Sequence, residues 1–387
     1  MGYDFTTEDV AYLRSSDGAA ALAEVDQLEL STRTHLADIG RVRARFGDRS
    51  GSLVETALLR RRAVGKLDEP ARWLLTDDAL QQATPTVVAR RRAGRVAGRA
   101  VHDVTCSVGA ELSALVGVAS EVLGSDLDPV RLAMAARNVP AATVLRADAL
   151  VPVSRDTVVL ADPARRAGGK RRHDPSALQP PLPDLLDAYR GRDLSVKCAP
   201  GLDYDALDWD GEVEVVSLAG GVREACLWSP GLAGPGVRRR ATVLAADGTG
   251  WELTDAEPDD IPEREPGDWI VDPDGAVVRA GLVRHYAARH GLWQLDPRIA
   301  YLTGDTVPAG MRGFRILGQF KYTEKALRQE LARLDCGVVE ILVRGLDVDP
   351  ALLRPRLKLR GSVSLSVVLT RIGRGPVAFV CAAGARD

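Results

Sequence analysis

Between residues 101 and 162, four short apolar segments alternate with stretches that favour helices or turns, and this alternation constrains the fold most. The segments predict strands at 101–104, 121–125, 143–145 and 157–161. Three of them lead into an aspartate: Asp126, Asp148 and Asp162. Strands separated by helices form a parallel, doubly wound sheet. Ligands bind such sheets beyond the carboxyl ends of the strands, and the three aspartates fall there.

The turn after the first strand consists of residues that let a ligand approach the backbone closely. Its small residues are Thr105, Cys106, Ser107, Gly109 and Ala110. A helix is predicted directly after the turn, at 112–118, and the N-terminus of a helix offers free backbone N–H groups. The turn therefore predicts a site for a nucleotide-like cofactor.

Two cofactor classes fit this turn, a dinucleotide and S-adenosyl-L-methionine. A dinucleotide site typically carries G-x-G-x-x-G, whereas the turn here has one glycine, Gly109. An acid after the second strand serves either class, because both present ribose hydroxyls, and Asp126 or Asp128 supplies it. Asp148 can accept a hydrogen bond from an adenine amino group, and Asp162 falls beside the place of a transferable methyl group. These later acids favour S-adenosyl-L-methionine.

The ordered set of motifs resembles the class I S-adenosylmethionine-dependent methyltransferases. Residues 103–109 read D-V-T-C-S-V-G and are similar to the D-x-x-C-G-x-G motif of RNA-modifying members, with Ser107 in place of a glycine. Residues 124–138 resemble the G-x-D-x-D-P…A-x-x-N run of trimethylguanosine-synthase-like and RNA guanine methyltransferases. The resemblance implies that eight residues bind the cofactor: Asp103, Thr105, Cys106, Ser107, Gly109, Asp126, Asp128 and Asp148.

The run after the fourth strand, Asp162-Pro163-Ala164-Arg165, is the predicted reacting centre. Members that methylate amino groups carry D/N-P-P-aromatic there, and the acid and the proline carbonyl accept from the target amine and orient it. Here alanine replaces the second proline, and no aromatic residue occurs from 161 to 188. Arg165 is a candidate to stack on a base instead. The resemblance therefore implies methylation of an exocyclic base nitrogen of RNA, guanine N2 being one candidate, with Asp162, Pro163 and Arg165 in the catalytic centre.

Two alternatives stay open. The D-P-x-R form also resembles RNA 5-methyluridine methyltransferases, in which a cysteine after the fifth strand attacks the pyrimidine. Cys198 follows the predicted strand at 194–197 and could serve as that nucleophile, although a lone cysteine is more often a buried small residue. The second alternative is a non-catalytic RNA-binding protein that kept a cofactor pocket, which the departure at Ala164 and Arg165 would explain.

The densest basic run of the chain directly follows the reacting centre, where a substrate phosphate would need it. Its glycines, Gly168 and Gly169, fit a loop. A solvated charged loop is the alternative interpretation, but the position of the run favours a substrate contact. The predicted substrate-binding residues are Arg166, Lys170, Arg171, Arg172 and Lys197.

The predicted organisation has four parts: helices over 1–90, the methyltransferase sheet over 91–255, a linker or small α/β domain over 256–310, and an α/β unit over 311–387. The last part resembles a THUMP-like domain in residues 313–321 and 358–361, which implies RNA by analogy. The fold class is a doubly wound Rossmann-like α/β sheet with an N-terminal helical domain and this C-terminal domain. We also expect Thr7 to cap the first helix and one helix over 276–290.

Charge and cysteine content restrict the remaining function classes. The formal net charge of −2 excludes a polycation, and no apolar run approaches a membrane span. The five cysteines are widely spaced, which predicts neither a disulfide framework nor a metal site. We expect a cytoplasmic protein that binds RNA, with no membrane or metal partner; the sequence leaves the oligomeric state open.

Overall fold

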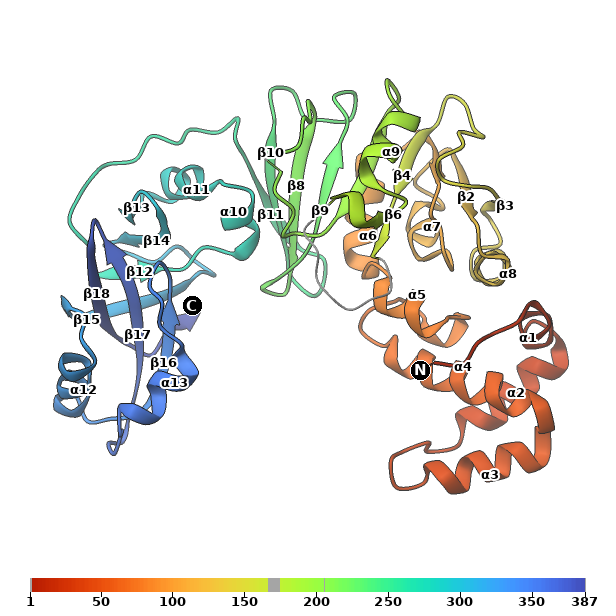
Figure 1. The fold of residues 1–387 in the computed structure, drawn as a ribbon, viewed down its shortest axis with the longest axis horizontal. Helices are drawn as coiled ribbons and strands as arrows, with labels where there is room; N and C mark the ends of the chain where they lie inside the picture. Colours follow the sequence, from red (N-terminus) through yellow and green to blue (C-terminus); the bar gives the residue numbers. More distant parts are fainter. Residues whose placement is uncertain (1, 166–174, 205, 387) are drawn as a thin grey trace. The chain divides into compact units, whose positions relative to one another are not determined.

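The structure, a computed structural model, describes residues 2–165, 175–204 and 206–386 (Figure 1). The chain divides into two compact units. The first comprises Met1–Leu218, Arg223–Pro235 and Leu244–Thr249, and the second comprises Ala219–Val222, Gly236–Val243 and Gly250–Asp387. The four-part division that the sequence suggests, with boundaries near residues 90, 255 and 310, stays a prediction. Among the described residues, no helix combines the length and apolar character that a bilayer crossing requires.

The first unit opens with a group of helices, as expected for this region. They are α1 (Thr7–Leu13), α2 (Ser16–Asp26), α3 (His35–Phe46), α4 (Ser50–Arg62), α5 (Asp77–Gln82) and α6 (Thr86–Arg95). The expected cap of α1 was wrong by one residue. Thr6 is the N-cap, because its hydroxyl accepts from the Asp9 N–H at 3.1 Å while the Asp9 carboxylate accepts from the Thr6 N–H at 3.0 Å. This reciprocal pair needs a spacing of three residues, which Thr7 does not offer.

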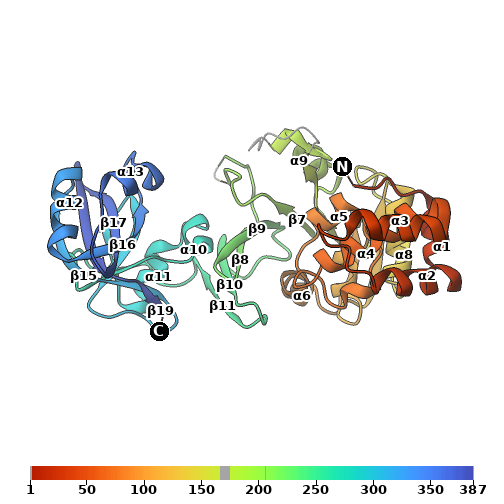
Figure 2. The same cartoon turned by 90° about the horizontal axis from the view of Figure 1, so that it is seen from below.

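The N-terminal helices pack onto the sheet part of the same unit. Buried Leu53, Leu59 and Trp73 belong to one apolar cluster with Val108 and Met134 from the sheet region. Helix α1 lies beside the later helix α8 (Pro129–Asn138) (Figure 2). The N-terminal helices therefore form part of the apolar core around the turn that follows β1.

The first unit's sheet has the predicted doubly wound form. Its strands are β1 (Ala100–Asp103), β2 (Glu121–Asp126), β3 (Thr143–Arg146), β4 (Val158–Ala161), β7 (Leu194–Cys198), β8 (Glu212–Leu218) and β9 (Gly221–Trp228). They follow the order β8-β9-β7-β4-β1-β2-β3. The run β7-β4-β1-β2-β3 is parallel, and β9 is antiparallel to β7. Helices α7 (Ala110–Leu115), α8 and α9 (Leu182–Ala188) connect the strands.

Two local features shape the elements near the carboxyl ends of the parallel strands. Asp128 caps α8 as predicted, since its Oδ1 accepts from the N–H groups of Val130 at 2.8 Å and Arg131 at 3.1 Å. After β4, the short strands β5 (Ala164–Arg165) and β6 (Leu178–Gln179) pair antiparallel, which sequence periodicity did not predict.

The second unit contains a mixed sheet with helices. Its sheet follows the order β13-β14-β12-β15-β18-β17-β16, and β19 pairs with β15. These strands are β12 (Trp269–Val271), β13 (Trp293–Asp296), β14 (Ile299–Gly304), β15 (Arg312–Lys321), β16 (Cys336–Val343), β17 (Val363–Ile372), β18 (Gly375–Ala382) and β19 (Ala385–Arg386). The chain also forms strands β10 (Arg239–Leu244) and β11 (Gly250–Thr254) and helices α10 (Gly275–Arg279), α11 (Val283–His290), α12 (Glu324–Arg333) and α13 (Pro350–Arg356).

Two features of the second unit refine the expectations. Strand β12 pairs antiparallel with both β14 and β15, so the segments before and after residue 310 contribute to one sheet. The single helix expected over 276–290 was wrong: α10 and α11 are separate helices. Gly281, with φ +76°, lies between them in the left-handed region, which ends a right-handed helix.

Candidate functional site

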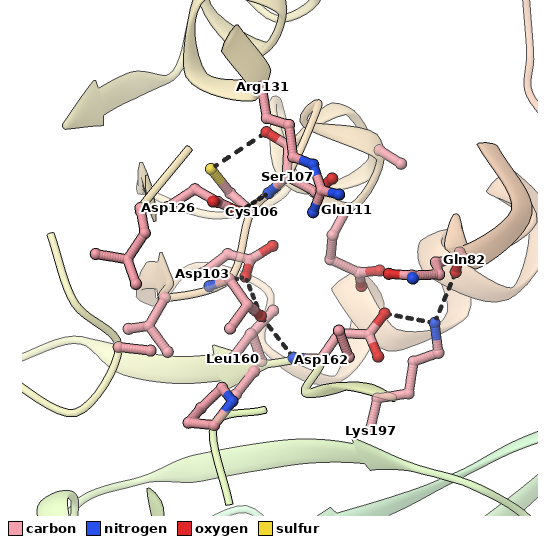
Figure 3. A pocket seen from close by; sticks show the side chains of 18 of the residues that line it. Gln82, Asp103, Cys106, Ser107, Glu111, Asp126, Arg131, Leu160, Asp162 and Lys197 are labelled. Atoms are coloured by element: carbon pink, nitrogen blue, oxygen red, sulfur yellow. Dashed lines mark hydrogen bonds and ion pairs between the residues drawn. The ribbon is translucent and has the colours of Figure 1, made fainter. Parts of the chain in front are cut away.

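A cavity of about 750 Å³ lies at the carboxyl ends of the parallel strands (Figure 3). Most of the predicted site residues line it together. These are Asp103, Thr105, Cys106, Ser107, Asp126, Asp128, Asp148, Asp162 and Lys197. Gly109 and Pro163, both described, are not among the lining residues. The side chain of Arg165 and the predicted Arg166, Lys170, Arg171 and Arg172 lie outside the described part of the chain.

Thr105 joins the first turn to the reacting centre. Its backbone N–H donates to Asp103 Oδ1 at 3.0 Å, which closes the turn after β1. Its hydroxyl accepts from the Asp162 N–H at 2.7 Å, although the two residues are 57 positions apart. The turn and the end of β4 are therefore held together by one side chain.

Two residues of this turn lie in the left-handed region of backbone space. Ser107 has φ +50°, a conformation that favours glycine, which is the residue the resembling motif carries there. Gly109 has φ +87°, and a Cβ at this position would lie 3.1 Å from Val139 Cγ2. Gly109 thus supports the turn from outside the cavity, by allowing the start of α7 to approach α8.

Asp126 holds the turn from the neighbouring strand. Its Oδ2 accepts from the Ser107 N–H at 3.0 Å, and its Oδ1 accepts from the Asp128 N–H at 2.9 Å. Each carboxylate oxygen can accept more than one hydrogen bond, so both retain capacity for a ligand in the cavity. Asp148, which is exposed, accepts from the Leu150 N–H at 2.9 Å in the same local manner.

Asp162 and Lys197 form an ion pair on another side of the cavity (Figure 3). Lys197 Nζ lies 2.6 Å from Asp162 Oδ2 and also donates to Thr84 Oγ1 at 3.0 Å and the Gln82 carbonyl at 3.3 Å. Burial alone disfavours the charged ammonium, but Asp162 and Glu224 outweigh it, so the pKa of Lys197 is raised. An ammonium has three donors, and all three are used within the chain.

The sequence prediction missed a buried ionic cluster beside this pair. Arg92 on α6 bonds Glu111 at 2.6 Å and also pairs with Glu224 on β9. Arg92 and Glu111 both line the cavity. Glu111 Oε1 is buried and has no hydrogen-bond partner among the described residues. An acidic oxygen in this state suits a cationic or N–H group of a ligand.

The sequence did contain a signal for these contacts. Arg92 and Arg95 are three residues apart on one helix, while Glu212, Glu214 and Glu224 fall within largely apolar strands. Buried carboxylates require cations, and Arg95 indeed bonds Glu212 at 2.6 Å and Glu214 at 2.8 Å. Matching the strand acids to helix arginines would have located the cluster.

Burial also changes the acids near the turn. It raises the pKa of Asp103 to about 8. The nearby Glu111 carboxylate raises this pKa further, and the hydrogen bond from the Thr105 N–H opposes the shift. Burial raises the pKa of Glu111 as well, although Arg92 opposes it. The two acids therefore share a strongly desolvated part of the cavity wall, where a bound cation would be favourable.

Asn138, the last residue of the A-x-x-N run, ties the turn after β1 to the segment between α4 and α5. Its amide accepts from the Leu74 N–H at 2.8 Å and donates to the carbonyls of Leu74 and Val108, both at 2.9 Å. An amide satisfies both kinds of backbone group at once. The Asn138 side chain thus has a structural role, which is to connect these two backbone segments.

The surroundings of Cys198 disfavour a nucleophilic thiolate. Its side chain is buried and is not among the described residues that line the cavity. Burial raises the pKa of the Cys198 thiol to about 12, with the Asp162 charge adding to the effect. The covalent route through this cysteine therefore has no structural support.

Comparison with known proteins gives two family matches. Residues 311–383 match the model of the THUMP domain-like family, and residues 6–63 match that of a domain of unknown function. A protein of Mycobacterium tuberculosis (strain H37Rv) is 59% identical over 354 residues, which is 88% of this chain and 98% of that protein. Its name is uncharacterized S-adenosylmethionine-dependent methyltransferase.

A solved structure shares the fold over nearly the whole length. It is a crystal structure from Porphyromonas gingivalis W83, described as that of a methyltransferase, with a TM-score of 0.75. The alignment covers 99% of each chain at 19% sequence identity. At this identity the likeness concerns the fold alone.

Proposed function

Because the chain belongs to the S-adenosylmethionine-dependent methyltransferases, we propose that it methylates an exocyclic base nitrogen of RNA. Asp162 is the observation that carries the proposal. Its carboxylate lines the cavity at the end of β4, paired with Lys197. An ionised carboxylate accepts hydrogen bonds and donates none, so it suits an acceptor group that carries N–H.

The cavity wall fits S-adenosyl-L-methionine, which supplies an electrophilic methyl group on a sulfonium sulfur. We propose that Asp126 binds the ribose hydroxyls and Asp148 the adenine amino group. The buried, unpartnered Oε1 of Glu111 fits the cationic amino group of the methionyl part, with Asp103 beside it. Thr105, Cys106, Ser107, Gly109 and Asp128 complete the proposed cofactor site through the shape of the turn.

The chain's own contribution to the reaction is mainly orientation. The Asp162 carboxylate accepts from one N–H bond of the target amine. The carbonyl of Pro163, which is not itself among the lining residues, is the proposed acceptor for the second N–H bond, and the two acceptors would aim the nitrogen lone pair at the methyl group. With S-adenosyl-L-methionine bound, the N–C bond would form as the S–C bond breaks, with S-adenosyl-L-homocysteine as the product. The nitrogen then loses a proton, and the adjacent Asp162 carboxylate is placed to take it.

The proposal that RNA is the substrate rests mainly on features outside the cavity. The THUMP domain-like match and the RNA-methyltransferase form of the motifs support it. The described lining residues include no aromatic ring, so stacking of the target base falls to the guanidinium of Arg165. Arg166, Lys170, Arg171 and Arg172 are the proposed phosphate contacts.

Two measurements on the full-length protein test this function. Calorimetry should detect binding of S-adenosyl-L-methionine and S-adenosyl-L-homocysteine. Labelled methyl should then pass to total RNA from a strain that lacks the gene, and nucleoside mass spectrometry should find an N-methylated base. Binding without transfer would instead favour the non-catalytic RNA-binding protein, and label at pyrimidine C5 would contradict the amine assignment.

A further inference from the structure

The ammonium of Lys197 has a complete set of partners inside the chain. The Asp162 carboxylate, the Thr84 hydroxyl and the Gln82 carbonyl all lie within hydrogen-bond distance. The Lys197 side chain is only 16% exposed, whereas the Asp162 side chain is 41% exposed. The lysine is thus enclosed while its carboxylate partner remains open to the cavity.

We propose that Lys197 is a positioning residue, which holds the Asp162 carboxylate toward the acceptor and is itself placed by the corner between α5 and α6. This deepens the proposed function and rests on it, since Asp162 is the acceptor-orienting group there. The corner, residues 82–84, lines the same cavity. The N-terminal helices therefore contribute directly to the acceptor site.

The geometry disfavours a direct substrate contact, such as one to a phosphate, for Lys197, to which the sequence assigned a substrate-binding role. A lysine is a compact charge on a flexible stem, so its position depends on its anchors. A phosphate would have to displace one of three existing acceptors, and breaking the pair would leave Asp162 without its cation. Uncompensated charges in a partly buried site are costly.

Other charged groups surround the ammonium from several elements. Glu224 on β9 and Glu111 on α7 add negative charge, while Arg92 on α6 and Lys66 add positive charge. Thr84, which is neutral, fixes the direction of the ammonium without changing this balance. Thr84 therefore offers a way to disturb the placement of Lys197 while its charge is kept.

The first test needs no substrate. The chain has six lysines, so lysine labelled with ¹³C at Cε gives few NMR signals, and Lys197→Arg identifies the one from Lys197. In the wild type, the Lys197 signal should titrate at higher pH than those of the other lysines. In Asp162→Asn it should titrate at lower pH than in the wild type, because the largest charge that opposes the effect of burial is then lost. An unchanged Lys197 titration in Asp162→Asn would overturn the proposal.

The second test separates positioning from substrate contact. Lys197→Met should lower kcat for methyl transfer to the same total RNA about 100-fold, the effect of a misplaced group, while S-adenosyl-L-homocysteine binding persists. Thr84→Val should lower kcat roughly tenfold, which is the loss of one hydrogen bond from a charged donor, and Thr84→Ser should restore most of it.

A raised KM for RNA with unchanged kcat in Lys197→Met would show a substrate contact and contradict positioning. If the wild type transfers no methyl to RNA, the proposed function fails. The lysine titration then still decides whether Lys197 holds Asp162, so the two failures are distinguishable.

Discussion

The two halves of the cavity are held in place in different ways. In the cofactor half (the turn 103–109 with Asp126, Asp128 and Asp148), most carboxylates accept from backbone N–H groups two or three residues further along the chain. In the acceptor half (Asp162, Lys197 and the corner 82–84), the bonds join residues 35 to 115 positions apart. The cofactor half is therefore built with its own strands and turns, whereas the acceptor half requires the folded domain.

This difference separates two kinds of damage. A substitution in the cofactor half removes a hydrogen bond near the backbone and should weaken cofactor binding. A substitution in the acceptor half leaves that turn intact and should slow methyl transfer. Thr105 is the connection between the halves, because its hydroxyl accepts from the Asp162 N–H.

The largest effect is expected for Asp162→Ala. Methyl transfer to RNA should fall by about 10²- to 10⁴-fold, because both the oriented acceptor and the proton acceptor are lost. S-adenosyl-L-homocysteine binding, measured by calorimetry, should stay close to that of the wild type, which also verifies the fold. Asp162→Asn is the matched control: it keeps an acceptor oxygen and should retain more activity. If Asp162→Ala lost S-adenosyl-L-homocysteine binding and methyl transfer equally, the two halves of the cavity would not have separate roles.

Asp126→Ala should produce the reverse pattern. We expect the Kd for S-adenosyl-L-homocysteine to rise by about 10- to 100-fold, since hydrogen bonds to a charged group contribute about 1.5–3 kcal/mol. Asp126→Asn keeps one acceptor oxygen for the turn, so its Kd should lie between those of the wild type and Asp126→Ala. Calorimetry measures both variants. A wild-type Kd in Asp126→Ala would contradict the assignment of this acid to the cofactor half.

A different kind of effect, on stability and not on activity, concerns the pH dependence of the free energy of unfolding. Burial raises the pKa of Asp103 to about 8, so between about pH 4 and pH 8 its folded carboxyl keeps a proton that the unfolded carboxyl has released. The free energy of unfolding should therefore fall as pH rises through this window, with a limiting slope of about 1.4 kcal/mol per pH unit. Asp103→Asn should flatten that slope in denaturant unfolding series. Equal slopes in both proteins would show that Asp103 is ionised in the fold.

The difference between the cofactor half and the acceptor half also explains which features the sequence could predict. Strand-end acids, the Asp128 cap and the parallel sheet follow from short-range patterns, and all were found. The partners of Lys197 depend on contacts with Asp162 and Thr84 that only the folded sheet brings together, so the lysine was given a substrate role instead. The Arg92 cluster was missed for the same reason, although the glutamates within apolar strands indicated that cations must lie nearby.

The smallest expected effect tests whether the cofactor half depends on backbone shape alone. Ser107 has φ +50°, which costs a non-glycine residue about 1–2 kcal/mol, partly offset because glycine has a more flexible unfolded chain. Ser107→Gly should therefore raise the free energy of unfolding by less than about 1 kcal/mol and leave the Kd for S-adenosyl-L-homocysteine unchanged. Ser107→Ala keeps the Cβ and removes only the hydroxyl, so it should match the wild type in both measurements. A weaker Kd in both variants would instead reveal a hydroxyl contact to the cofactor, and the turn would then act through a side chain as the acceptor half does.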